Sequence, residues 1–249
     1  VHILNVSFLV PRMRREFGGC AGNIAYNLKL LGGDPIPMAT VGQDFGAYRD
    51  WFAEMAIPLD RVKEIPELFT PQAFITTDLD NNQITAFHPG AMMRSYENHV
   101  RDVPDVSIGI VSPDGYEGML QNAKEFAEAG IPFIFDPGQA MPLFNGAELR
   151  AFIEQAQYVT VNDYESNLLQ ERTGWSEQEI AGKVKAYITT RGPQGAEIHA
   201  DGTTHRIPPA HERRVTDPTG CGDAYRAGLI FGIEKGYDWM TIGRMGNLM

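Results

Sequence analysis

Cysteine is scarce in this chain of 249 residues, which contains two, Cys20 and Cys221. Two cysteines are too few for a disulfide framework, and neither stands in a C-x-x-C metal motif. The sequence therefore indicates neither a disulfide-stapled secreted fold nor a zinc module. We expect two reduced thiols and a cytoplasmic location.

Basic residues are also in the minority. Lysine and arginine number 21 against 32 aspartates and glutamates, so the formal net charge is −11. Such a chain has no basic footprint for nucleic acid, and no apolar run approaches the roughly 20 residues of a membrane span. The stretch VHILNVSFLVPRMRRE at the start lacks both an initiator methionine and the pattern of a signal peptide. We predict neither nucleic acid nor a membrane as a partner.

Strand-like and helix-like segments alternate from about residue 24 onward, and 43% of the residues are hydrophobic, enough for a sizeable core. Repeated alternation predicts an α/β fold, with a mostly parallel sheet and helices on both faces. Asp201-Gly202 predicts the tight turn of a hairpin near the end of the sheet. The predicted strands include 106–112 and 158–162, and the predicted helices include 147–156, 163–172, 176–185 and 222–235.

Two stretches depart from this alternation because no helix separates their strands. Residues 71–90 read as a hairpin around Asp80-Asn81-Asn82, and the apolar start of the chain reads as a further strand. We therefore expect residues 1–249 to form one domain with a small β lid made of about 3–17 and 71–90.

A phosphate-binding loop of the form G-x-x-x-x-G-K-[ST] is absent, so ATP would need another anion site. The stretch TDPTGCGDAYRAG contains a candidate, because Gly220, Cys221 and Gly222 lie at a helix entry, where free N–H groups and the helix dipole attract phosphate. Asp223 is suited to accept the proton of an alcohol during phosphoryl transfer; the alternative is a carboxylate that only favours the dipole. A dinucleotide fingerprint belongs in the first strand–helix unit, not near the chain end.

GGCAGN, residues 18–23, also precedes a helix. Gly19 lets a ligand approach the backbone, and Asn23 both donates and accepts hydrogen bonds, which suits the hydroxyl groups of a polyol. The alternative is a tight loop with an N-capping asparagine.

Two further motifs follow predicted strands. NDYE contains Asn162 and Glu165, where a carboxylate is suited to hold waters around Mg²⁺; the alternative is an ordinary helix cap. TTRGPQG would let a nucleotide lie against the backbone, and its alternative is a turn between strands; its candidate residues are Thr190, Gly192 and Gly195.

With these four motifs in this order, the chain resembles the ribokinase-like (pfkB) family of sugar and nucleoside kinases. GGCAGN resembles the first signature of the family, and DPTGCGDAYRAG resembles the second, D-T-x-G-A-G-D, here with Pro218 and with Cys221 in place of alanine. NDYE resembles the N-x-x-E magnesium motif. The segment AFITTDLDNNQITAFHPGAM looks most like bacterial members called adenosine kinase or carbohydrate kinase. Family members begin with a strand that is not found here and continue past the equivalent of Met249, so we expect both terminal segments to be missing.

The resemblance implies ATP-dependent phosphoryl transfer, with Asp223 as the catalytic base and Gly220, Cys221 and Gly222 as the anion hole. It further implies that the acceptor hydroxyls are held by Gly19 and Asn23, that the Mg²⁺ waters and phosphates are held by Glu165 with Asn162, and that the nucleotide is bordered by Thr190, Gly192 and Gly195. The implied cofactors are ATP and Mg²⁺, with a monovalent cation as a further candidate.

The acceptor and the oligomeric state stay open at this point. A sugar such as ribose or fructose competes with a nucleoside, with adenosine slightly favoured. Phe8, Phe17, Phe74 and Phe87 are candidates to stack on a purine; alternatively they fix the lid to the core. The rival from another class is a non-catalytic ligand-binding protein, and the chain is expected to be a monomer or a homodimer.

Overall fold

The computed structural model describes residues 7, 9–80, 82–211 and 219–249. Its centre is a six-stranded sheet in the order β10-β9-β8-β7-β6-β5. The parallel part comprises β5 (Gly109–Val111), β6 (Phe133–Phe135), β7 (Tyr158–Asn162) and β8 (Ala186–Thr190). The strands β9 (Ala196–Ala200) and β10 (Thr203–Ile207) continue it as an antiparallel hairpin. The prediction of a mostly parallel sheet is confirmed.

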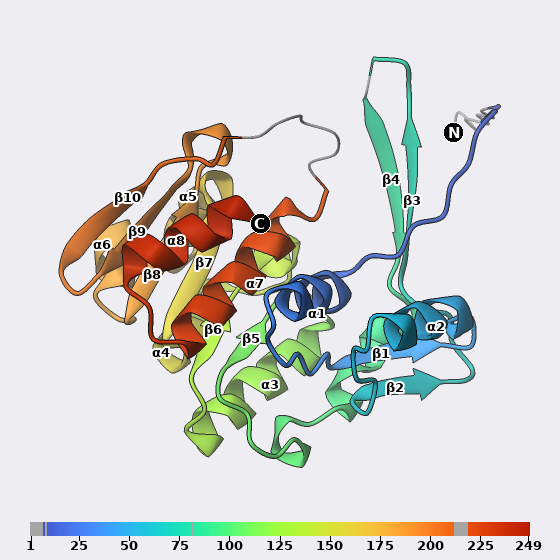
Figure 1. Cartoon of the computed structure of the whole chain (residues 1–249), viewed down its shortest axis with the longest axis horizontal. Helices are drawn as coiled ribbons and strands as arrows, with labels where there is room; N and C mark the ends of the chain where they lie inside the picture. The colour runs from blue at the N-terminus through green and yellow to red at the C-terminus, as the bar shows by residue number, and fades with distance from the viewer. Residues whose placement is uncertain (1–6, 8, 81, 212–218) are drawn as a thin grey trace.

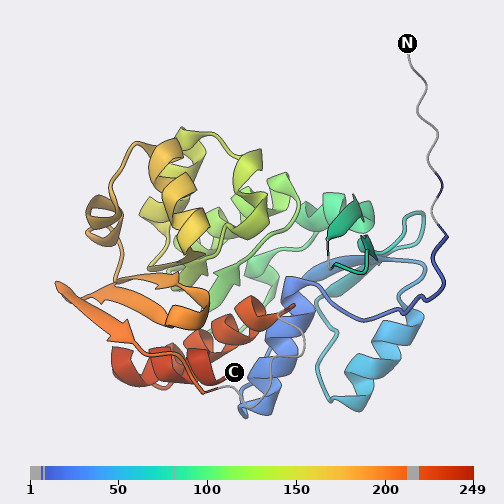
Figure 2. The same ribbon diagram turned by 90° about the horizontal axis from the view of Figure 1, so that it is seen from above.

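Helices cover both faces of this sheet, as Figure 2 shows. One face carries α3 (Tyr116–Ala129), α4 (Gly146–Gln155), α5 (Asp163–Thr173) and α6 (Glu177–Ala181). The other carries α1 (Cys20–Leu30), α7 (Cys221–Glu234) and α8 (Trp239–Leu248). Alternate side chains of β6 belong to different hydrophobic cores. Phe133 and Phe135 pack in the core under α3 to α6, and Ile134 packs in the core under α1, α7 and α8.

A smaller unit stands beside the large sheet. It consists of the parallel pair β1 (Ala39–Gly42) and β2 (Val62–Ile65) with α2 (Gly46–Glu54), and its own core includes Phe45 and Phe52. After a hairpin at 72–88, two 3₁₀ segments, Gly90–Glu97 and Val100–Asp102, lead the chain to β5. Two more, Gly138–Leu143 and Gly192–Gln194, follow β6 and β8.

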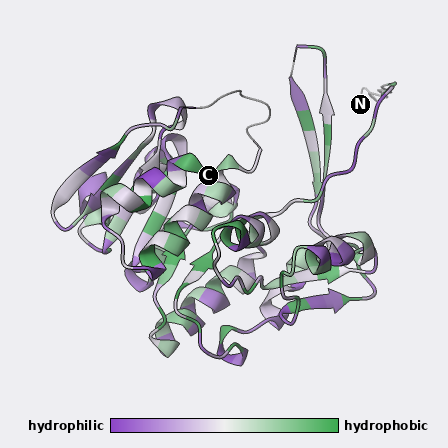
Figure 3. Ribbon diagram, viewed as in Figure 1, coloured by the Kyte–Doolittle hydropathy of each residue, from purple (hydrophilic) through white to green (hydrophobic). Residues whose placement is uncertain are grey.

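The predicted hairpin forms from β3 (Gln72–Thr77) and β4 (Gln83–His88) and projects away from the body (Figure 1). Hydrophobic and hydrophilic residues are mixed along it (Figure 3), and nearly all of its side chains are exposed. The expected contribution of residues 3–17 needs correction: the described residues 7 and 9–17 contain no strand and do not pair with the hairpin, while 1–6 and 8 lie outside the described residues. In the part of the chain that the structure describes, no helix is long and apolar enough to cross a membrane.

Candidate active site

Polar side chains follow four neighbouring strands at the same edge of the sheet. Ser112 comes directly after β5, Asp136 directly after β6, Asn162 ends β7 and Thr190 ends β8. The four strands are parallel, so their carboxyl ends meet at one edge, which is where open α/β sheets bind ligands.

The beginnings of α1 and α7 meet at this edge. Gly220, with a left-handed φ of 83°, precedes α7, and Gly19, with a φ of 91°, precedes α1. The Asn23 Nδ2 group donates a hydrogen bond of 2.8 Å to Asp223 Oδ2, which joins two signatures that lie 200 residues apart in the chain. The alternative of an N-capping Asn23 is wrong, because Asn23 lies inside the first turn of α1 and Gly19 is the N-cap.

A buried ion pair lies next to this contact. Arg226 donates to Asp136 through two parallel hydrogen bonds, Nη2 to Oδ1 at 2.7 Å and Nε to Oδ2 at 2.9 Å. Ser112 Oγ donates to the same Asp136 Oδ2 at 2.9 Å. Sequence reasoning missed all three residues. Asp136 follows the apolar run FIF directly, the same signal that indicated Asn162, whereas Arg226 is the single basic residue of α7 and stands next to a mainly apolar stretch.

Burial, together with nearby carboxylate charges, raises the pKa of two side chains in this region. Burial raises the pKa of the Cys20 thiol, and the nearby Asp223 and Asp136 carboxylates add to the increase. Burial also raises the pKa of Tyr48 to about 12, with a further contribution from Asp223. Cys20 is therefore a neutral thiol beside Asp223, and neither Cys20 nor Tyr48 is suited to act as a nucleophile at neutral pH.

Asn162 and Glu165 form a capping box at the start of α5. The Asn162 Oδ1 atom accepts from the Glu165 N–H at 2.8 Å, and Glu165 Oε2 accepts from the Asn162 N–H at 2.8 Å. The helix-cap interpretation of NDYE is thus correct locally. Burial, followed by the charge of Asp136, raises the pKa of Glu165, while Arg226 lowers it. A half-buried carboxylate of this kind gains from a nearby cation.

Among the described residues, no three histidine, cysteine, aspartate or glutamate side chains converge on a possible metal position. A single carboxylate together with nucleotide phosphates and waters is nevertheless the kind of ligand set that Mg²⁺ takes in nucleotide sites. Glu165 fits that arrangement.

Thr190 pairs with Asn162 in the register of β7 and β8, so the third and fourth motifs are neighbours. Beyond Thr190, Gly192 (φ 51°) and Gly195 (φ 88°) make a tight turn into β9. A Cβ atom on Gly195 would lie 2.1 Å from the Ile207 carbonyl oxygen, so the close approach of β10 requires glycine there. The alternative interpretation of TTRGPQG, a turn between two strands, is therefore correct locally, because the motif connects β8 to β9.

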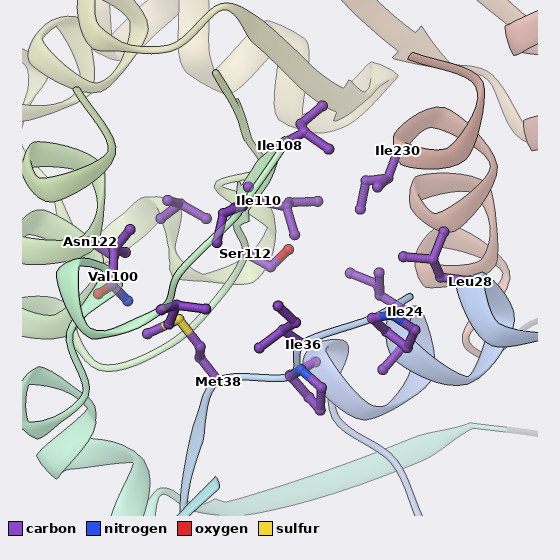
Figure 4. A pocket seen from close by; sticks show the side chains of 18 of the residues that line it. Ile24, Leu28, Ile36, Met38, Val100, Ile108, Ile110, Ser112, Asn122 and Ile230 are labelled. Carbon is purple, nitrogen blue, oxygen red and sulfur yellow. The ribbon is translucent and has the colours of Figure 1, made fainter. Parts of the chain in front are cut away.

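A cavity of about 230 Å³ adjoins the site between α1, β5 and α7 (Figure 4). Its walls are mainly aliphatic and include Ile24, Leu28, Ile110 and Ile230. Its polar lining includes Ser112, next to Ile110, and Asn122, on the side of Val100 (Figure 4). Aliphatic walls do not suit phosphates or sugar hydroxyls, so we place the chemistry at the neighbouring sheet edge.

Residues 3–249 match the pfkB family of carbohydrate kinases. The chain belongs to this family. The family predicted from the two signatures is confirmed, as is the ribokinase-like fold.

Solved structures and curated relatives agree with this assignment. The nucleoside kinase of Burkholderia thailandensis in complex with inosine is 57% identical, has a TM-score of 0.93, and is matched over 98% of this chain and 80% of that one. The nucleoside kinase of Methanocaldococcus jannaschii is 32% identical over 97% of this chain and 80% of its own length. The ribokinase of Lactococcus lactis is 28% identical over 88% of this chain and 72% of its own length. This pfkB-family protein is an ATP-dependent carbohydrate or nucleoside kinase.

Proposed function

We propose that this kinase transfers the γ-phosphoryl group of ATP to the hydroxymethyl group of a nucleoside. The observation that carries the proposal is the hydrogen bond between Asn23 and Asp223. This bond brings Asn23, the residue proposed to hold the acceptor, next to Asp223, the proposed base, at the beginnings of α1 and α7. A free hydroxyl placed between Asn23 and Asp223 would face the backbone N–H groups of the Gly220–Gly222 turn.

In the proposed step, the acceptor oxygen forms a bond to the γ-phosphorus of ATP, and Asp223 takes the hydroxyl proton. The bond from the γ-phosphorus to the bridging β–γ oxygen breaks, and ADP leaves with that oxygen. Gly220, Cys221 and Gly222 would hold the charge of the transferred group through their N–H groups and the dipole of α7.

We propose Mg²⁺ as the metal cofactor, held by Glu165 with Asn162 through waters and by the nucleotide phosphates; when bound, it neutralises charge on those phosphates. Thr190, Gly192 and Gly195 would border the nucleotide. A monovalent cation is a separate expectation, tested by replacing potassium chloride with tetramethylammonium chloride and comparing kcat.

The acceptor class is the finer part of the proposal. The 57% identity to a kinase described in complex with inosine supports a purine nucleoside, and adenosine, favoured from the sequence, carries the same hydroxymethyl group. An aromatic wall adjoins Gly18: Phe17 stacks on Tyr48 with ring centroids 4.4 Å apart, and Tyr48 Oη donates to the Gly18 carbonyl at 3.1 Å. Phe17 is partly exposed, which leaves ring surface available for a base.

The test is a comparison of kcat/KM for adenosine, inosine, ribose and fructose with ATP and Mg²⁺ on the full-length protein. A nucleoside is expected to exceed both sugars by about tenfold or more, because base stacking contributes about 1–3 kcal/mol. If kcat/KM for ribose or fructose exceeds that for both nucleosides by the same factor, the nucleoside assignment is wrong, while the assignment as a kinase is unaffected.

Location and assembly complete the proposal. Both cysteines are free thiols, which suits the cytoplasm, where ATP is the phosphoryl donor. The chain is proposed to act as a monomer or a homodimer, and light scattering after size-exclusion chromatography distinguishes the two.

A further inference from the structure

One guanidinium group lies among three carboxylates at the candidate site. Arg226 and Asp136 are 7% and 2% exposed, so their double hydrogen bond is almost removed from water. Burial opposes the charge of Arg226, but Asp136 first, and then Glu165 and Asp223, raise the pKa of the guanidinium above its ordinary value. The charges of all three carboxylates therefore act on this one cation.

The same side chain also contacts the turn that precedes Asp223. Arg226 Nη1 donates to the Gly222 carbonyl at 3.0 Å. A Cβ atom added to Gly222 would lie 2.9 Å from that nitrogen, so a side chain there would require the guanidinium to shift away from its present position. Arg226 thus ties the first turn of α7 to Asp136, which is fixed at the end of β6 by Ser112.

We propose that Arg226, held by Asp136, is a positioning residue that fixes the Gly220–Gly222 turn and offsets the negative charge around Asp223. The inference rests on the proposed role of Asp223 as the base. Without the guanidinium, three like charges would share a poorly solvated region, and like charges disfavour one another there. The turn and the Asp223 carboxylate would then lose their common support.

The test compares variants of the full-length protein with the acceptor it turns over fastest. Removing one member of a buried pair leaves the other charge unpaired and destabilises the fold, so Arg226→Met alone is not decisive. The double variant Arg226→Met/Asp136→Asn removes both charges. We expect it to fold, as judged by circular dichroism and a cooperative thermal transition. We further expect its kcat to fall about 10²-fold, because small misplacements of catalytic groups have effects of that size.

The KM values for ATP and acceptor should change far less than kcat in the folded double variant. Arg226→Lys, which keeps the charge but not the paired hydrogen bonds, should recover part of the kcat. Arg150→Met is the matched control, since Arg150 donates to the Thr173 carbonyl at 2.8 Å and lies over the Trp175 ring, away from the site. It should lower the melting temperature and leave kcat near the native value. A folded double variant with native kcat overturns the proposal.

A second cycle separates this inference from the proposed function. If Arg226 acts through Asp223, adding Asp223→Asn to the double variant should lower kcat little beyond Asp223→Asn alone, because residues that act as a unit are not additive. Full additivity contradicts the positioning role. Native turnover in the single Asp223→Asn variant would instead reject Asp223 as the base.

Discussion

A carboxylate at Asp223 directly follows a turn suited to phosphate, and a phosphate bound there would repel it. A simple role in stabilising the helix dipole is worth only about 1 kcal/mol, which does not explain a contact with Asn23 on another helix. We predict that Asp223→Asn lowers kcat by about 10²–10⁴-fold because the proton acceptor is lost. Steady-state kinetics check this, and circular dichroism should show an unchanged fold.

Glu117→Gln is the matched control for Asp223→Asn. Glu117 is an exposed carboxylate in the first turn of α3 and contributes to a helix dipole in the same way. Its loss should leave kcat unchanged. A similar loss of kcat in both variants would mean that the effect at Asp223 comes from the helix rather than from proton transfer.

One carboxylate oxygen of Glu165 accepts a hydrogen bond in the capping box of α5. Glu165 is proposed to act on Mg²⁺, whereas Gly19 and Asn23 are proposed to hold the acceptor, so a substitution at Glu165 should affect the metal more than the acceptor. We predict that Glu165→Gln raises the Mg²⁺ concentration needed for half-maximal turnover more than it raises the KM of the acceptor, because the carboxylate charge is lost while the capping contacts can persist. Titration of Mg²⁺ at saturating ATP measures this. An unchanged Mg²⁺ titration would reject the assignment.

At the scale of elements, the connection from β5 to α3 holds a carboxylate that should make stability depend on pH. Burial raises the pKa of Asp114 from 3.8 to about 6, although the Gly115 N–H and Ser95 partly oppose the increase. A raised pKa stabilises the folded state below pH 4, and this contribution is lost as the pH rises through about 6.

Asp114→Asn should therefore be more stable than the native protein at pH 7, by at most about 3 kcal/mol, and should lose that advantage at pH 4. The amide introduced by this substitution carries no charge to bury, and its oxygen can still accept from the Gly115 N–H. Urea unfolding of both proteins at the two pH values measures the difference. An equal difference at both pH values contradicts the prediction.

Nearly all side chains of the β3–β4 hairpin are exposed, and a two-stranded sheet on its own is only marginally stable. We predict that the hairpin closes over the acceptor, so that water is excluded from the reacting groups. Amide hydrogen exchange in 72–77 and 83–88 should then slow when a nucleoside binds. Equal exchange with and without a nucleoside that is turned over rejects the lid.

The two phenylalanines of the hairpin lie on opposite faces, so each serves as a control for the other in a test of the lid. Phe74 faces the same side as Ala86, and Phe87 faces the other side with Ala73. Both rings are more than half exposed, at 59% and 52%, so neither fixes the lid to the core. Only one of Phe74→Ala and Phe87→Ala should raise the KM of the nucleoside; the other should not.

Elements with strong local signals were predictable from the sequence. The strand at 158–162 has the predicted bounds because a continuous apolar run ends at a polar asparagine, and Asp201-Gly202 makes the turn between β9 and β10 with positive φ at both residues. The strand β2 and the helix α8 were not predicted. The segment VKEI of β2 is half charged and lies in a two-stranded sheet, so its apolar pattern is too weak to indicate a strand.

The site was predictable only in part, and for a related reason. Gly19, Asn23, Asn162, Glu165, Thr190 and Asp223 stand in short motifs that can be recognised locally. The pairing of Arg226 with Asp136 joins residues 90 positions apart. A single basic residue next to a mainly apolar stretch gives no indication of its partner until the sheet places the end of β6 beneath α7.

At the scale of the whole molecule, the proposed acceptor site joins the two structural units. Tyr48 comes from α2 of the smaller unit, Asn23 from α1, and Asp223 from α7 on the large sheet. The helices α1 and α7 pack against each other, which fixes the two signatures side by side. A ligand that contacts all three helices should therefore stabilise the molecule as a whole and not one element alone.

We predict that adenosine or inosine at 100 times its dissociation constant raises the melting temperature by about 5–10 °C, since binding at that excess adds about 2.7 kcal/mol to a protein of this size. Ribose at the same concentration should give a smaller shift, because it lacks the base that Phe17 and Tyr48 are proposed to contact. Asn23→Ala should reduce the increase in melting temperature with the nucleosides and with ribose. Differential scanning calorimetry of the full-length protein measures all of these. Equal shifts for ribose and the nucleosides would show that the base adds no binding free energy, and the proposed nucleoside preference would then be wrong.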